Sequence, residues 1–203
     1  MIAILTGDII NSEGHKASEW IDVLKKKLSE WGQHPSDWEI YRGDEFQVRI
    51  APEEALRAGI QLKALIKSMK NLDVRMAIGL GSEDFKGIRV SESNGTAYQR
   101  SGRTFENLKA DKRSLAITSG NDKKDRMLNL MLKLALDFMD EWTSVSAELV
   151  AIALENPDLS QQEIAQQLHI QQSAVSQRQK RARLDLVFDV LHFYSETVKS
   201  MEP

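Results

Sequence analysis

The chain has 203 residues, 41% of them hydrophobic and 28% charged, with a net charge of −3, which suits one domain of ordinary size plus a small second one. It has no cysteine, which excludes disulfides, thiol nucleophiles and thiolate zinc sites, and its four histidines lack metal-ligand spacing, so a metal site would use carboxylates and favour Mg2+ or Mn2+. No apolar run is long enough to cross a bilayer and the first residues lack the basic flank of a signal peptide, so we expect a cytoplasmic protein without a membrane partner.

The chain begins with a short apolar segment that is followed by a helical pattern. Residues 2–6 predict a central strand buried on both faces, bounded by Gly7 and with Asp8 at its carboxyl end. Apolar residues then recur at helical spacing over 17–31, and Gly32 follows the last of them. These patterns predict a strand and then a helix.

The next segment predicts a hairpin with acids at its tip. Apolar residues alternate with polar ones at the strand period of two, at Trp38, Ile40, Phe46, Val48 and Ile50. Gly43 and Asp44 form the turn between the two strands. Asp44 and Glu45 are either solvated turn residues or members of a site, and the turn chemistry alone does not distinguish the two.

Four more elements complete the first 120 residues. They are a helix over 53–71, a strand over 74–80, a helix over 97–108 and a strand over 115–118. The predicted order is β-α-β-β-α-β-α-β, and its first six elements match the split βαβ, or ferredoxin-like, arrangement of the α+β class. The first strand is central there and lies beside the hairpin, so Asp8 and Asp44 come within metal-bridging distance. Two converging carboxylates repel each other unless a cation or proton intervenes.

Three stretches resemble motifs of the class III nucleotide cyclases. Thr6-Gly7-Asp8-Ile9-Ile10 looks like their first-strand metal motif. Arg42-Gly43-Asp44-Glu45-Phe46 resembles both their Gly-Asp hairpin and the signature of the GGDEF diguanylate cyclases. Residues 75–81 and 95–103 are similar to the cyclase strand and its following helix. The whole chain resembles the SatD family of small bacterial proteins.

The resemblance implies a cyclase-like palm domain over residues 1–120 that binds Mg2+ or Mn2+ through Asp8, Asp44 and Glu45. The two positions that hold the triphosphate in the family fall on Gln99 and Arg103, which would be catalytic if the protein is active. The implied nucleotide-binding residues are Gly43, Gly95, Gln99 and Arg103. In class III cyclases such an arginine faces the metal pair of a partner subunit, so an active site would require a homodimer.

The sequence also departs from the cyclase pattern. Gln99 stands where the family has asparagine, and the residues after Asp8 (Asn11, Ser12 and Glu13) lack the phosphate-loop pattern. A palm that binds nucleotide without cyclising it is therefore compatible with these residues.

A long helix is predicted over 122–142, with apolar residues on two sides. One stripe holds Met127, Met131, Leu134 and Phe138, and the other holds Leu128, Leu132, Ala135, Met139 and Trp142. A helix that is apolar on two sides must be covered on two sides. It either packs between two domains, as a connecting helix over 121–143, or forms a dimer contact.

Residues 159–178 resemble the helix-turn-helix of sigma factors and bacterial repressors. Ile164, Leu168, Ile170 and Val175 have the spacing of its core, and Ser160 with Glu163 predicts a capping box. His169 stands at the turn, where a left-handed backbone is needed and glycine is usual. An ordinary amphipathic helix pair is the alternative. A helix over 185–198 would close the core of this small all-α domain, 144–203.

The charge pattern of the same region points to duplex DNA. Between Ile164 and Leu184 there is no acid, although the whole chain is acidic. In a major-groove docking the amino-terminal side chains of the second helix read bases, and these are Gln172, Ser173, Ser176 and Gln177. The basic side chains would hold phosphates, and these are Arg178, Lys180, Arg181 and Arg183. Because one copy offers only four basic residues, we expect two copies on a two-fold site.

Together these patterns predict a DNA-binding transcriptional regulator whose palm binds a divalent metal and a nucleotide or other phosphorylated ligand. The alternative is an active Mg2+- or Mn2+-dependent nucleotidyl cyclase or transferase with a DNA-binding tail. A third possibility is a protein-interaction module whose basic helix contacts an acidic partner. The acid pair at Asp8 and Asp44 favours the first two interpretations, and the acid-free stretch argues against the third.

Overall fold

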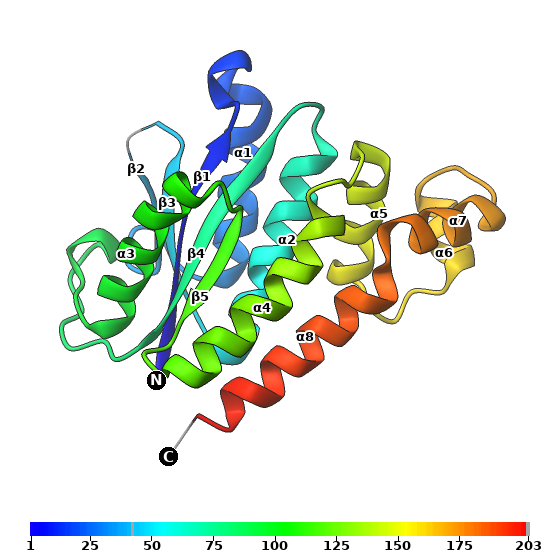
Figure 1. Ribbon diagram of the computed structural model, residues 1–203. Helices are drawn as coiled ribbons and strands as arrows, with labels where there is room; N and C mark the ends of the chain where they lie inside the picture. Colours follow the sequence, from blue (N-terminus) through cyan, green and yellow to red (C-terminus); the bar gives the residue numbers. More distant parts are fainter. Residues whose placement is uncertain (42, 202–203) are drawn as a thin grey trace.

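The computed structural model describes residues 1–41 and 43–201, which form one five-stranded sheet and eight α-helices (Figure 1). The strands are β1 (Ile2–Ile10), β2 (Trp38–Tyr41), β3 (Glu45–Ile50), β4 (Asp73–Gly81) and β5 (Leu115–Thr118). The helices are α1 (Ala17–Trp31), α2 (Ala55–Ser68), α3 (Thr96–Asp111), α4 (Asp122–Met139), α5 (Ser144–Glu155), α6 (Gln161–Gln167), α7 (Gln172–Ala182) and α8 (Leu184–Lys199). The α+β class and the order of the first eight elements are confirmed. Arg42 of the hairpin motif and residues 202–203 of the predicted carboxyl-terminal domain lie outside the described residues.

β1 is the central strand of the sheet, whose order is β2-β3-β1-β4-β5. It is antiparallel to β3 and β4, and β5 is parallel to β4. Alternation along the strands puts Leu5, Val48 and Ile78 on one apolar face, where they share a core with α1 and α2. The opposite face is polar at Thr6 and Asp8, and α3 covers part of it.

β1 is longer than predicted, and Asp8 lies inside it instead of at its end. The strand continues through Gly7 and ends at Ile10. Gly7 is a close-packing position, because a Cβ atom there would lie 2.7 Å from the ring of Phe46 and 2.8 Å from the carbonyl oxygen of Arg75. This glycine therefore lets strands and side chains approach closely, and it does not end the strand.

Two glycines of β4 explain how closely α3 packs on the sheet. A Cβ atom on Gly79 would lie 2.2 Å from the carbonyl oxygen of Ala97, and one on Gly81 would lie 2.3 Å from Oγ1 of Thr96. Ser101, one turn further along α3, is fully buried and donates to Oγ1 of Thr6 at 2.6 Å. The first half of α3 therefore lies directly on the backbone of β4.

The helices after the sheet pack outside α2 and along the edge of β5 (Figure 1). α4 ends at Met139, three residues earlier than predicted, and its inner stripe is buried through Leu128 and Leu132. α5 was not predicted, because residues 145–154 are apolar on most sides and show no single stripe. The main apolar core runs without interruption from the α1–α2 layer into α5 and α8, and Tyr194 of α8 donates to the carbonyl of Pro52 at 2.7 Å.

A buried lysine joins the sheet region to the end of α4. Lys63 of α2 has no exposed surface, and its Nζ lies 3.0 Å from Oδ1 of Asp73 and 2.7 Å from Oδ1 of Asp140. The hydroxyl of Ser114 donates to the same Asp140 oxygen at 2.8 Å. The cluster fixes α2, β4 and the chain after α4 relative to one another.

The outer edge of β5 is occupied by a side chain. The amide of Asn129 in α4 accepts from the backbone N–H of Ile117 at 3.0 Å and donates to the carbonyl of the same residue at 2.7 Å. Within the described ranges, no helix combines the length and apolar character needed to cross a membrane.

Candidate functional site

An ion-pair cluster surrounds Asp8 on the polar face of the sheet. The strand register places Asp8 directly opposite Glu45 on one side and Arg75 on the other. Arg75 donates to both oxygens of the Asp8 carboxylate, at 3.1 and 2.7 Å. Lys109, near the end of α3, lies 3.7 Å from Asp8 and 3.5 Å from Glu45. Two acids thus face two cations, and the Asp8 side chain is only 11% exposed.

Asp44 lies in the hairpin turn, next in sequence to Glu45, and is held by the segment that follows β1. The hydroxyl of Ser12 donates to Oδ2 of Asp44 at 2.5 Å. Gly43 before it has φ of 83°, the left-handed region that favours glycine in a turn. The structure therefore brings the hairpin tip to the loop after β1. The approach of the Asp44 carboxylate to that of Asp8 stays a prediction.

Beneath this cluster, polar contacts continue along the same face of the sheet. Gln47 donates to Oγ1 of Thr6 at 3.1 Å, and Ser101 donates to the same oxygen at 2.6 Å. All three side chains are buried, so each has a partner where water is excluded. The ion pairs of Asp8 thus lie next to buried polar side chains that already have hydrogen-bond partners.

The predicted triphosphate residues lie before Lys109 on α3, with Gly95 and Gln99 at the start of the helix and Arg103 at its middle. Gly95 precedes the helix, and Gln99, in its first turns, is 3.5 Å from Oδ1 of Asn94. Ten residues separate Gln99 from Lys109, which is about 15 Å along a helix at roughly 1.5 Å per residue. Arg103 is exposed and has no ion pair or hydrogen bond among the described residues. A single chain therefore does not bring these residues to the carboxylates.

Sequence reasoning missed both cations of the cluster. Arg75 occupies a polar position within the alternating pattern of β4, and that alternation places it on the same face as Asp8. Lys109 follows Phe105 by one helical turn, and its Nζ lies 5.1 Å from the centre of that ring. The register of β1 with β4, which decides that Arg75 meets Asp8, was not predicted.

No three described His, Asp or Glu side chains gather in a geometry that could hold a metal ion. Asp8 and Glu45 supply oxygen ligands of the kind that Mg2+ and Mn2+ prefer. Arg75 donates one hydrogen bond to each Asp8 oxygen, and each oxygen keeps a second lone pair that an ion could share. The donor chemistry therefore fits such an ion, which would compete with Arg75 and Lys109 for the charge of Asp8.

The second candidate surface is built by α6 and α7. Ser160 and Glu163 form the predicted capping box at the start of α6, and hydrogen bonds from Ser160 lower the pKa of Glu163. His169 in the turn has φ of 52°, so its predicted left-handed backbone is confirmed. Ile164 and Val175 are buried where the two helices meet. α5 packs behind α7 and leaves the outer face of α7 exposed.

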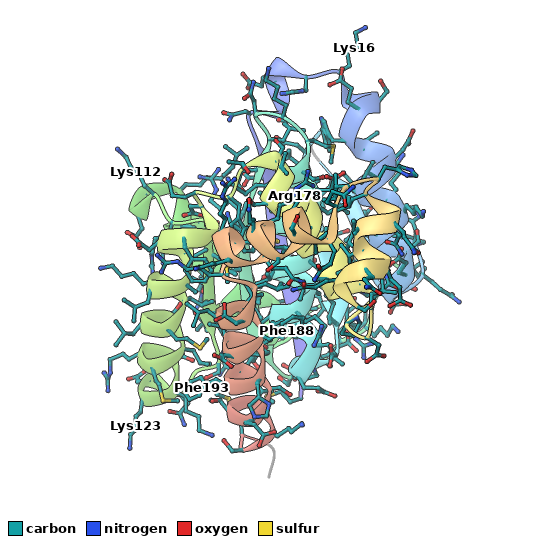
Figure 2. The ribbon with its side chains drawn as sticks, turned by 90° about the vertical axis from the view of Figure 1, so that its right-hand side faces the viewer. Lys16, Lys112, Lys123, Arg178, Phe188 and Phe193 are labelled. Atoms are coloured by element: carbon teal, nitrogen blue, oxygen red, sulfur yellow. The ribbon has the colours of Figure 1, made fainter. Side chains whose placement is uncertain are left out.

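The exposed face of α7 carries most of the predicted DNA-contacting residues. Seven are exposed: Gln172, Ser173, Ser176, Gln177, Lys180, Arg181 and Arg183. Arg178 is less available, because its Nη1 lies 3.6 Å from Oε2 of Glu148 and its side chain is 22% exposed (Figure 2). Arg183 ends α7 and lies over the ring of Phe138 at 5.4 Å. Lys180 and Arg181 have no ion pair among the described residues.

The side chains predicted to read bases differ in whether they are already hydrogen-bonded within the protein. Gln172 donates to Oε1 of Gln161 at 2.6 Å, and Gln161 donates in turn to Gln179, so these amides tie α6 to α7. In the part of the chain that the structure describes, Ser173, Ser176 and Gln177 have no such contact. Gln172 would have to exchange its hydrogen bond with Gln161 to reach a ligand.

These observations define an α+β protein with an ion-pair cluster on its sheet and an exposed helix, α7, that carries no acid. The SatD family matches residues 1–192, nearly the whole chain, and the chain therefore belongs to the SatD family. No curated protein matches it.

Proposed function

We propose that the chain is a DNA-binding transcriptional regulator that acts in the cytoplasm. In this proposal α6 and α7 form a helix-turn-helix, within a carboxyl-terminal domain that follows the connecting helix α4. The exposed face of α7 carries the proposal. It has basic residues and no acid on a chain whose net charge is −3, and such a local basic surface favours a polyanion such as DNA. The left-handed turn at His169 and the buried contact of Ile164 with α7 give additional support.

In this proposal α7 enters the major groove. Ser173, Ser176 and Gln177 would face base edges, with Gln172 joining them after it leaves Gln161. Lys180, Arg181 and Arg183 would hold phosphates, and Arg178 would contribute only when it leaves Glu148. Because so few cations are available in one chain, a stable complex requires two chains on a two-fold site.

The sheet region supports a second part of the proposal, a ligand site of the cyclase-like palm type. The strand order β4-β1-β3-β2, with α1 and α2 on one face, supports a ferredoxin-like arrangement. Asp8, Asp44 and Glu45 would hold Mg2+ or Mn2+, which would neutralise them and bind phosphate oxygens. Arg75 and Lys109, released from the acids, would be available for the phosphate groups of a nucleotide.

An active cyclase or transferase remains the alternative. Because neither Gln99 nor Arg103 contacts the carboxylates within the described part of one chain, this alternative requires a homodimer in which they reach the partner's carboxylates. Mixing Asp44→Asn chains with Arg103→Ala chains would then restore part of the pyrophosphate release that each variant lacks alone. Absence of rescue in confirmed mixed dimers would exclude the shared site.

DNA binding is tested by selecting from random duplexes with the full-length protein. A palindromic consensus is expected, with half-sites about 10 base pairs apart or a multiple of that. The variant Lys180→Gln/Arg181→Gln should bind every duplex more weakly and lower the salt slope by about two units. Lys25→Gln/Lys26→Gln, with the same change of charge on the exposed face of α1, is the matched control and should bind as the native chain does. No enrichment and no salt-dependent binding would refute the proposal.

The ligand site is tested by thermal unfolding. Mn2+ or Mg2+ together with a nucleoside triphosphate should raise the Tm of the native chain and leave Asp8→Asn/Asp44→Asn unchanged. Equal shifts in both proteins would remove the carboxylates from the proposal.

A further inference from the structure

A large apolar surface lies exposed along α4 and α8. Met127, Leu130 and Leu134 of α4 are 42%, 61% and 68% exposed, and Leu186 and Phe193 of α8 are 39% and 41% exposed. The two helices border a groove that these side chains line together. Figure 2 faces this side of the molecule and shows Phe193 beside α4. We call it the α4–α8 face.

The fold itself does not require these apolar residues. The inner stripe of α4, with Leu128, Leu132 and Met139, already fills the core. Leu130 and Leu134 point away from that core, although polar residues at both positions would suit a helix on the surface of a monomer. Contiguous exposed apolar patches of this kind mark interaction sites on soluble proteins.

The charges along the exposed side of α4 favour a second copy of the chain. Lys123 precedes Leu130 by seven residues and Asp137 follows it by seven, which is about 10 Å in each direction at roughly 1.5 Å per residue. Asp122 and Lys133 are also exposed on α4, so the pair that favours a second copy is Lys123 and Asp137, which are equally spaced from Leu130. An antiparallel pair of α4 helices, related by a two-fold axis at Leu130, would place Lys123 of each chain beside Asp137 of the other.

We propose that the α4–α8 face is the interface of a symmetric homodimer, in which α4 packs antiparallel against α4 of the second copy. Leu130 and Leu134 lie at the centre, the side chains of α8 extend the apolar contact, and two Lys123–Asp137 pairs flank it. The acids along this face, Asp137 and Asp189 among them, oppose an anionic membrane as the occupant. A parallel pair would instead bring like charges together.

The dimer gives the two recognition helices that the proposed two-fold DNA site needs, and only this last step rests on the proposed function. Arg183 links the two surfaces, because it ends α7 and also lines the groove between α4 and α8. Pairing through α4 and α8 would therefore set the separation of the two α7 helices.

The test measures the mass of the full chain in solution. Light scattering and sedimentation over a concentration series should give twice the 23.0 kDa of one chain. Leu130→Glu/Leu134→Glu should be monomeric with an unchanged circular dichroism spectrum, because both side chains are largely exposed in one chain. Phe85→Gln/Ile88→Gln, which removes two exposed apolar side chains from the loop before α3, should stay dimeric as the matched control.

Charge reversal distinguishes the second copy from any other occupant. Lys123→Asp and Asp137→Lys alone should each weaken the dimer about 10-fold, and the double variant Lys123→Asp/Asp137→Lys should restore it. A native chain that stays monomeric at micromolar concentrations, or a double variant weaker than either single one, would overturn the inference. A dimer that binds no duplex would keep the interface and remove the proposed function. A monomeric chain that binds single half-sites would remove the interface and keep DNA binding as the function.

Discussion

Replacing Lys63 by methionine should destabilise the protein, because it removes the buried cation that Asp73 and Asp140 share. Methionine keeps most of the unbranched length of lysine, so the change creates little empty space. Lys63 Nζ is within 3.2 Å of both oxygens of Asp73 and 2.7 Å from Asp140, and it also donates to Ser114 at 3.3 Å. The loss therefore measures the ion-pair cluster and not the packing.

The expected magnitude follows from the exposure of the two acids. Removing one partner of a fully buried pair costs about 3 to 5 kcal/mol. The side chains of Asp73 and Asp140 are 19% and 42% exposed, and Asp73 keeps Lys67 at 3.0 Å, so water and a second cation offset part of the loss. We expect a loss of about 2 to 3 kcal/mol, which lowers Tm by roughly 5 to 10 °C in a chain of this size.

Urea unfolding followed by circular dichroism measures this difference. Lys25→Met, at an exposed position of α1, is the control and should change stability by less than about 0.5 kcal/mol. Adding Asp73→Asn to Lys63→Met should recover part of the loss, because it removes one unpaired charge. If Lys63→Met unfolds at the same urea concentration as the native chain, the cluster does not stabilise the fold and the reasoning is wrong.

Three further predictions test single residues. Arg89 lowers the pKa of the buried Glu39 carboxyl, so the ion pair stabilises the fold at neutral pH and loses this effect as the pH falls below the range where a free glutamate titrates. Glu39→Gln should therefore be less stable than the native chain at pH 7, and the difference should shrink in urea unfolding at decreasing pH. Gly79→Ala should cost several kcal/mol in urea unfolding, because its Cβ would lie 2.2 Å from the carbonyl oxygen of Ala97. His169→Gly should stabilise the chain by about 0.5 to 1 kcal/mol, because glycine adopts the φ of 52° without strain, and a lower Tm would contradict this.

The sheet was predictable because its patterns are local. Alternation at Phe46, Val48 and Ile50 defined the hairpin, and the order of elements placed β1 at the centre. The length of β1 was not predictable from one sequence, since Gly7 is compatible with either a turn or a close approach, and only the positions of Phe46 and Arg75 decide between them.

The candidate sites were predictable to different degrees. The capping box at Ser160 and the turn at His169 depend on neighbouring residues, and both predictions were confirmed. The pairing of Asp8 with Arg75 and Lys109 depends on strand register and on the course of α3 across the sheet, which link residues far apart in the sequence. The roles proposed for these residues stay predictions until ligands are tested.

The amide of Asn129 acts as a one-residue imitation of a neighbouring strand. It offers Ile117 both the donor and the acceptor that another chain would have to offer to extend the sheet beyond β5. An unprotected edge strand invites such additions, and these lead to open-ended fibres instead of closed assemblies. With α4 fastened over this edge, growth of the sheet beyond β5 is blocked at Ile117, and association on this side of the molecule is left to helical surfaces, which can close around a two-fold axis.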